Sequence, residues 1–218
     1  MPETIQTQRE SGIVTITLNN PEKRNALTML AWKSLAETLR PLSADKTIRC
    51  IIIRGAGDKA FAAGADISEF PEVRANAQQA TEYGKATALA LESLVECIHP
   101  TIALIEGACT GGGLEIAAAC DIRIANASSK FGVPINRLGH PLAYPEMKPV
   151  LGAIGRANVL DLLLTGRIIC AQEALRMGLV SQVFADDAIV EAVYEMASQI
   201  NKAAPLSNRY TKKFVNRM

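Results

Sequence analysis

Residues 101–119 read TIALIEGACTGGGLEIAAA, and this stretch decides the fold. Its first part, residues 101–106, is an apolar run that predicts a buried strand. The glycine-rich loop 107–113 follows, and the small apolar residues 114–119 predict a helix that begins directly after the glycines. A buried strand joined to a helix by a short loop is typical of α/β domains, in which ligands bind at the carboxyl ends of the strands. We therefore expect a functional site at this loop.

Strands and helices alternate along the rest of the chain as well. The β-branched, alternating residues 13–18 predict a half-buried strand, and the apolar run 50–53 predicts a central parallel strand covered on both faces. Helical spacing of apolar residues predicts one helix capped by Thr28 and a longer one over residues 75–98, separated from the second strand by a loop at 61–70. Short strands are expected at 121–124 and 179–184, with helical stretches from Pro145 onward. This order predicts an α/β domain with parallel strands.

Length and composition limit the class of protein. The chain has 218 residues, 49% of them hydrophobic, which suits a single domain over 1–218 with a core up to about residue 185 and a helical region from about 186 onward. A formal net charge of +1 lacks the basic excess of a nucleic-acid-binding domain, so we expect no nucleic-acid or membrane partner. Disordered proteins and small disulfide scaffolds are excluded.

Cysteine and histidine usage concerns the compartment and metal binding. Five scattered cysteines in apolar surroundings indicate free thiols in a reducing compartment. Two histidines without a CxxC or HExxH motif predict no bound metal. The first ten residues lack the features of a signal peptide, and the apolar runs are too short to cross a bilayer. We expect a cytoplasmic protein.

Two loops of small residues suggest the chemistry of the site. Residues 61–67 (FAAGADI) follow one core strand and residues 107–113 (GACTGGG) follow another. Small side chains let two backbone N–H groups converge on a carbonyl oxygen that becomes negative in a transition state, and one such donor contributes about 3 kcal/mol. The alternative is that the glycines only permit tight packing of a helix on a strand. Neither loop matches a phosphate-binding motif.

Glu115 is the candidate acid–base residue. It lies in the first turn of an otherwise apolar helix, beside the second loop. A carboxyl group there either stabilises the helix dipole or acts as a general acid or base whose pKa is raised by desolvation. Its proximity to the two loops favours the catalytic interpretation.

Five motifs, in this order, resemble the enoyl-CoA hydratase/isomerase (crotonase) superfamily. They are NAL at 25–27, FAAGADI at 61–67, GGGLEI at 111–116 with CD at 120–121, KFGVP at 130–134, and LTGR at 164–167 with 174–180. The resemblance implies a crotonase (ClpP-like) fold of repeated ββα units with a mainly helical C-terminal part. It also implies a homotrimer or a dimer of trimers.

The resemblance further implies that an acyl-CoA thioester binds here, with no separate cofactor and no metal. The thioester oxygen would be held by the amides of Ala65 and Gly112, and Glu115 would move protons. The coenzyme A and acyl group would contact Lys23, Arg24, Ala26, Leu27, Ala63, Asp66, Ile67, Gly111, Ile135 and Tyr144. Lys23 and Arg24 suit phosphates electrostatically, although solvated turn charges are the alternative.

This sequence departs from the family pattern at Ile135. Hydratases of the family use a second glutamate after the Phe-Gly motif, where this chain has isoleucine. Enoyl-CoA hydratase remains the leading prediction. The alternatives are a reaction that needs one acid–base group, such as isomerisation or decarboxylation, and an acyl-CoA-binding protein with weak catalysis. The candidate substitutes for the lost carboxylate are Asn136, His140, Tyr144 and Glu146.

The C-terminal segment is a second departure. Residues 208–218 predict the start of an amphipathic helix, and family members usually continue with further helices. The resemblance leaves open whether the helical part is naturally short or truncated.

Overall fold

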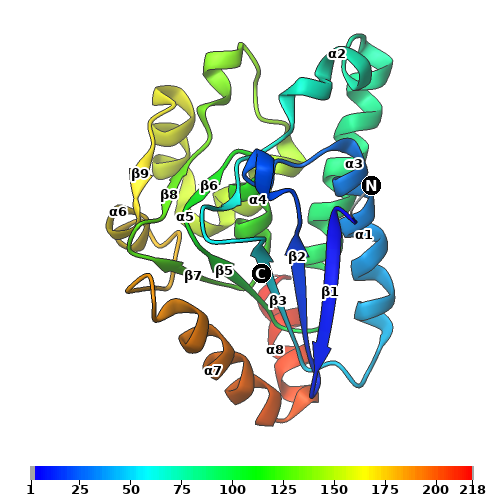
Figure 1. The fold of residues 1–218 in the computed structure, drawn as a ribbon, viewed down its shortest axis with the longest axis vertical. Helices are drawn as coiled ribbons and strands as arrows, with labels where there is room; N and C mark the ends of the chain where they lie inside the picture. The colour runs from blue at the N-terminus through cyan, green and yellow to red at the C-terminus, as the bar shows by residue number, and fades with distance from the viewer. Residues whose placement is uncertain (1–2, 218) are drawn as a thin grey trace.

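Two strands and then a helix recur four times along the chain (Figure 1). The computed structural model describes residues 3–217. The four units are β1 (Ile5–Glu10), β2 (Ile13–Leu18) and α1 (Met29–Ala44); β3 (Cys50–Gly55), β4 (Ala60–Ala62) and α3 (Ala77–Val95); β5 (Thr101–Ile105), β6 (Ala108–Thr110) and α4 (Gly112–Ala119); and β7 (Ile122–Asn126), β8 (Lys130–Gly132) and α5 (Tyr144–Thr165). This is the repeated ββα arrangement that the sequence motifs imply.

Shorter elements connect and follow these units. The connections contain η1 (Pro21–Lys23), η2 (Ile67–Glu69), α2 (Phe70–Val73) and η3 (Pro134–Leu138). After the fourth unit come β9 (Ile169–Cys170), α6 (Ala171–Arg176), β10 (Gln182–Phe184), α7 (Ile189–Lys202) and α8 (Pro205–Val215). The helical character expected beyond about residue 186 is therefore present. Within residues 3–217, no helix combines the length and the apolar character that a membrane span requires.

The strands form two sheets. In the large sheet the order is β1-β2-β3-β5-β7-β10, and every pair is parallel except β1 with β2. The small sheet has the order β4-β6-β8-β9, in which β8 and β9 are antiparallel. The expectation of parallel strands is thus right for the core of the large sheet and wrong for these two pairs. Residues expected as loops at 61–70 and 107–113 contain β4 and β6, because three-residue strands show no periodicity in the sequence.

The central strand β3 is covered on both faces, as its apolar run predicts. Ile51 and Ile53 belong to the main core beneath α1 and α3, whereas Cys50 and Ile52 pack on the opposite face against α7. Figure 1 shows α1 and α3 on one side of the large sheet and α7 on the other. The parallel register pairs Ile51 with Thr101, so β3 and β5 end at the same edge. That edge carries the glycine loops.

Local signals in the sequence set the helix boundaries. The Thr28 side chain accepts a hydrogen bond from the Ala31 amide at 3.1 Å and caps α1, as predicted. Helix α3 begins later than expected because Asn76 caps it, accepting from the Gln79 amide at 3.0 Å. Of the helical stretches expected after Pro145, those near residues 150 and 160 form one helix, α5, which is kinked at Gly155, and those near 171 and 187 correspond to α6 and α7.

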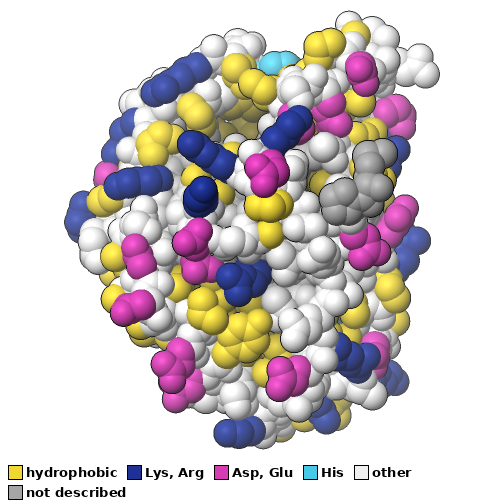
Figure 2. Space-filling model, in the orientation of Figure 1, with side chains coloured by type: hydrophobic (Ala, Val, Ile, Leu, Met, Phe, Trp, Pro, Cys, Tyr) yellow, Lys and Arg dark blue, Asp and Glu magenta, His cyan; other side chains and the backbone are white. Residues whose placement is uncertain are grey.

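Charges of both signs are distributed over the surface. On the face drawn in Figure 2, acidic and basic side chains are interspersed. Hydrophobic side chains line a recess near the top of that face. The recognition of an anionic ligand must therefore depend on a few local cations.

Candidate functional site

A cavity of about 150 Å³ lies where β4 and β6 end and α4 begins. Its floor is formed by the two loops of small residues, including Ala63, Ala65, Gly111 and Gly112. Side chains from α1, α3 and the segment 133–146 form its walls. The structure thus brings the two predicted loops to one cavity.

Two free amides face this cavity. Within residues 3–217, neither the Ala65 N–H nor the Gly112 N–H has a protein hydrogen-bond acceptor, although one amide next to each of them does. The Asp66 amide donates to the Leu27 oxygen at 2.9 Å, and the Gly111 amide donates to the Gly132 oxygen at 2.9 Å. Buried N–H groups are normally paired, so two unpaired ones at a cavity form a binding site for an oxygen atom.

The sequence leaves two roles open for the glycines of the second loop, a backbone N–H donor at the site and tight packing of a helix on a strand. Different glycines serve each role. Gly111 has φ of +50°, which side chains disfavour, and this conformation turns the chain into α4. At Gly113 a Cβ atom would lie 2.2 Å from the Ala62 oxygen, so that glycine permits close packing of the helix on β4. Tight packing thus explains Gly113, whereas the free amide belongs to Gly112.

Glu115 lines the same cavity from the first turn of α4. Its side chain is buried, with only 4% of the residue exposed, and within residues 3–217 no protein group donates a hydrogen bond to it. Burial raises the pKa of Glu115 well above its usual value, and the negative charge of Glu146 raises it further. A helix dipole at this position would lower the pKa, so desolvation dominates. A carboxyl group in this state is suited to holding and transferring a proton.

The match to known proteins agrees with this geometry. A family profile described as enoyl-CoA hydratase/isomerase matches residues 8–218. The chain belongs to the enoyl-CoA hydratase/isomerase family. The family predicted from the motifs is thereby confirmed.

Relatives in the enoyl-CoA hydratase/isomerase family cover nearly the whole chain. The short-chain-enoyl-CoA hydratase of Clostridium acetobutylicum is 32% identical over 96% of this chain and 80% of its own length. The (E)-benzylidenesuccinyl-CoA hydratase of Thauera aromatica is 36% identical over 97% of this chain and 81% of its own. A crystal structure of an enoyl-CoA hydratase/carnithine racemase from Magnetospirillum magneticum is 47% identical and has a TM-score of 0.97, covering 100% of this chain and 81% of that chain. These matches confirm the crotonase fold.

The segments predicted to hold coenzyme A lie side by side in this family member. The Ala63 amide donates to the Arg24 oxygen at 3.0 Å, and the Leu27 amide donates to the Gly64 oxygen at 2.8 Å. These bonds join the stretch containing Lys23, Arg24, Ala26 and Leu27 to the stretch containing Ala63, Ala65, Asp66 and Ile67. Of the eight, Ala63, Ala65 and Ile67 line the cavity, and the others lie outside it.

Lys23 differs from Arg24 in its availability. The Lys23 ammonium donates to Asp66 at 2.7 Å and to Ser68 at 2.9 Å. Asp66 in turn caps η2 by accepting from the Ser68 amide at 3.1 Å. Arg24 is exposed and makes no ion pair among residues 3–217. Of the two predicted phosphate-binding cations, Arg24 is the one with an uncommitted charge.

The structure places only some of the candidate substitutes for the missing glutamate at the cavity. Ile135 lines the cavity, as do His140 and Glu146. Tyr144 is 70% exposed and does not contribute to the cavity, so the structure does not support its predicted place at the acyl group. Its position as the first residue of α5 turns it outward, while Glu146, two residues later, lies on the inner side of the same turn.

The aromatic wall of the cavity was not identified from the sequence. The Trp32 indole donates to the Tyr83 hydroxyl at 3.2 Å, and Tyr83 packs edge-on against Phe70 with ring centroids 5.8 Å apart. The Arg74 guanidinium lies 4.7 Å from the Phe70 ring and 5.0 Å from the Tyr83 ring. Helical spacing predicted the helix over 75–98 that carries Tyr83, but no pattern indicated that the loop residue Arg74 would join it.

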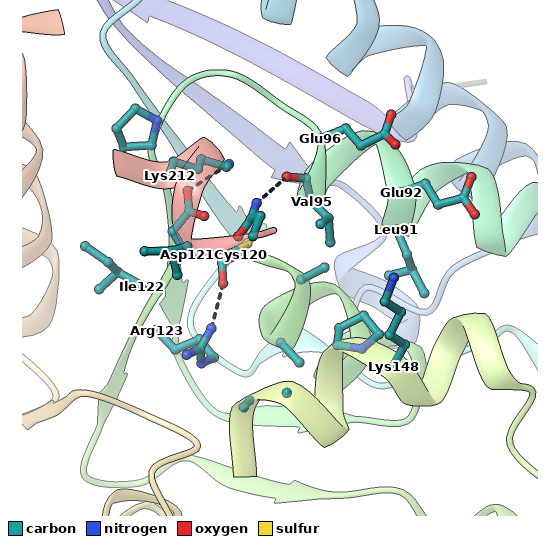
Figure 3. A pocket seen from close by; sticks show the side chains of 18 of the residues that line it. Leu91, Glu92, Val95, Glu96, Cys120, Asp121, Ile122, Arg123, Lys148 and Lys212 are labelled. Atoms are coloured by element: carbon teal, nitrogen blue, oxygen red, sulfur yellow. Dashed lines mark hydrogen bonds and ion pairs between the residues drawn. The ribbon is translucent and has the colours of Figure 1, made fainter. Parts of the chain in front are cut away.

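A larger hollow of about 740 Å³ lies elsewhere, between α3, α5 and α8 (Figure 3). Its polar centre is Asp121, whose carboxylate is held by the Thr101 amide at 2.8 Å and by the Lys212 ammonium at 2.8 Å. Neither the free amides nor Glu115 line it. Size alone therefore does not identify the functional site.

Proposed function

We propose that this protein is an enoyl-CoA hydratase, which adds water to the double bond of a 2-enoyl-CoA thioester. The observation that carries the proposal is the buried Glu115, which accepts no hydrogen bond from residues 3–217, beside the amides of Ala65 and Gly112, which find no acceptor in that range. Family membership and relatives named as hydratases support the same activity.

The geometry supplies the two things that hydration needs at the thioester. Addition of water to the β-carbon pushes electrons into the thioester carbonyl, so its oxygen becomes negative. The amides of Ala65 and Gly112 stabilise that charge, each donor contributing roughly 3 kcal/mol to the transition state. The enolate then takes a proton at its α-carbon, and the protonated Glu115 carboxyl is positioned to donate it.

Coenzyme A enters as part of the substrate, and no separate cofactor is proposed. The paired segments around Arg24 and Ala65 support its binding, because exposed backbone and one uncommitted cation lie beside the mouth of the cavity. The acyl group is less narrowly defined, since the names of the relatives cover short-chain and benzylidenesuccinyl thioesters. The cavity of about 150 Å³ favours a short acyl chain.

One observation favours a second candidate function. Ile135 puts an apolar side chain where the family resemblance implies the second glutamate of a hydratase. A reaction that uses a single acid–base group, such as enoyl-CoA isomerisation or decarboxylation, would tolerate this. Assays of isomerisation and decarboxylation beside hydration separate the two candidates.

The Glu115→Gln variant tests the proposal directly. We expect wild type to hydrate crotonyl-CoA, followed as loss of the conjugated thioester absorbance, and the variant to lose roughly 10²- to 10⁴-fold in kcat/KM because the proton donor is gone. Glu96→Gln, at an exposed residue directly after α3, is the matched control and should retain wild-type turnover. Hydration that survives undiminished in Glu115→Gln rules out this role for Glu115.

We also propose the assembly and setting that the family resemblance implies. These are a homotrimer or a dimer of trimers, a cytoplasmic location and a part in fatty acid metabolism. Analytical ultracentrifugation measures the assembly state directly.

A further inference from the structure

Hydration moves two protons, and the proposed site as described so far handles one. A proton must leave the attacking water, and a proton must reach the α-carbon. Ile135 packs against the hydrophobic core and offers no titratable group at the position where a second glutamate is implied. The following inference rests on the proposed hydratase function and asks which residue handles the other proton.

The four polar candidates differ in where their side chains lie. Asn136 donates its amide to the Leu164 oxygen at 3.0 Å and lies outside the cavity. Tyr144 is largely exposed and also lies outside. His140 lines the cavity but is an exposed residue of the loop before α5. Glu146 is the remaining candidate, a half-buried carboxyl group on the cavity wall.

Backbone capping fixes the Glu146 carboxyl in place. Its Oε2 accepts a hydrogen bond from the Ala143 amide at 3.1 Å, which anchors the side chain to the first turn of α5. Within residues 3–217, no protein donor reaches its other oxygen, Oε1. One oxygen therefore orients the group while the other is available to water or substrate.

Charged groups from every wall of the cavity face Glu146. They are Glu115 on α4, Arg74 after α2 and His140 before α5, and the Tyr83 hydroxyl on α3 lines the same space. The negative charge of Glu146 raises the pKa of Glu115. Burial raises the pKa of Glu146 as well, but the hydrogen bond from the Ala143 amide and, to a smaller extent, the nearby Arg74 and His140 side chains oppose this. Glu115 is the more deeply buried of these two carboxyl groups, and within residues 3–217 no protein group donates a hydrogen bond to it, so it keeps a proton more readily than Glu146 does.

We propose that Glu146 is the second acid–base residue of this site, in place of the glutamate implied at position 135. The ionised Glu146 removes a proton from water, and the oxygen of that water bonds to the β-carbon. The π electrons move into the thioester, whose oxygen is held by Ala65 and Gly112. Protonated Glu115 then donates its proton to the α-carbon. Transfer of the proton from Glu146 to Glu115 resets the pair, so the balance is one water added.

The experiment compares Glu146→Gln with Glu115→Gln in two assays. The first assay is hydration of crotonyl-CoA, and the second is exchange of the α-hydrogens of butyryl-CoA with D2O, which requires a base at the α-carbon but no water activation. We expect Glu146→Gln to lose hydration by roughly 10²- to 10⁴-fold while retaining exchange, and Glu115→Gln to lose both. Glutamine retains an oxygen for the Ala143 amide, so the cap of α5 is preserved. Glu96→Gln, at an exposed carboxyl group outside the cavity, is again the control and should change neither assay.

A rescue variant makes the test more specific. Adding Ile135→Glu to Glu146→Gln supplies a carboxyl group from another residue that lines the cavity and should restore part of the lost hydration. A purely structural role for Glu146 would not be rescued in this way.

The outcomes separate the failure of this inference from that of the proposed function. If wild type hydrates no 2-enoyl-CoA, the hydratase function fails and the role of Glu146 fails with it. If wild type is active and Glu146→Gln keeps its hydration rate, only the role of Glu146 fails. Equal loss of hydration and exchange in Glu146→Gln, together with a lowered Tm, would show a structural residue and also overturn the inference.

Discussion

Two acidic residues at opposite ends of α4, the buried Glu115 and the partly exposed Asp121, have contrasting surroundings. Asp121, just after the helix, has its carboxylate bound by the Thr101 amide, the Thr101 hydroxyl at 3.0 Å and the Lys212 ammonium. Glu115, in the first turn, has no protein donor among residues 3–217 and faces a cavity. A buried carboxylate with all its partners in place stabilises the fold, whereas one without partners costs stability. The difference indicates that Asp121 is structural and that Glu115 is retained for chemistry.

Activity is where the two residues should differ most. Glu115→Gln, already expected to remove roughly 10²- to 10⁴-fold of hydration, should leave the Tm at neutral pH unchanged or raised, because a neutral amide replaces an unpartnered acid. Asp121→Asn should retain the wild-type rate per folded molecule. Rates and Tm values measured on the same preparations decide this. A Glu115→Gln protein that unfolds much more easily than wild type would remove the contrast.

In stability, Asp121→Asn should lose more than Glu115→Gln. This loss should be a smaller effect than the loss of activity in Glu115→Gln. Asp121→Asn keeps an oxygen for Thr101 but leaves the buried Lys212 ammonium without its counter-ion, with only the His99 oxygen at 3.0 Å. Breaking a fully buried pair costs 3–5 kcal/mol, and because Asp121 is partly exposed we expect about 2–3 kcal/mol in urea unfolding.

An exposed ion pair provides the control for Asp121. Glu82 and Lys85 form a surface pair on α3 at 2.7 Å, so Glu82→Gln should leave the urea midpoint almost unchanged. If Glu82→Gln and Asp121→Asn shift the urea midpoint equally, burial does not explain how the Asp121–Lys212 pair stabilises the protein.

Sequence patterns predicted those parts of the fold and of the site that depend on residues close together in the sequence. Apolar runs predicted β3 and β5, and the glycine loop and Glu115 were predicted because a short loop and the first turn of a helix must lie close together. The small sheet was missed because its strands β4, β6 and β8 have three residues each, too few for a period.

The positions of the remaining site residues depend on tertiary packing, which sequence patterns do not show. Tyr144 and Glu146 are two residues apart, and only the docking of α5 decides which of them enters the cavity. Arg74 reaches the site because its guanidinium stacks on Phe70 and Tyr83, a contact between a loop and a helix face that no spacing encodes. Asp121 was recognised only as part of a motif, since its partner Lys212 lies on the last helix.

The smallest of the expected effects concerns Glu115 and the pH dependence of stability. Because the pKa of Glu115 is raised in the folded protein, folding keeps a proton that the unfolded chain has released. Its contribution to stability is fully present below its unfolded pKa near 4.5 and is lost as the pH rises toward the raised folded value. Glu115→Gln lacks this loss, so the Tm of the variant minus that of wild type should widen between about pH 5 and pH 8. Glu146 contributes with the same sign, so the double variant Glu115→Gln, Glu146→Gln should have the flattest profile. A difference that stays constant, or narrows as the pH rises, would mean that Glu115 is ionised in the folded protein and that its surroundings resemble those of Asp121.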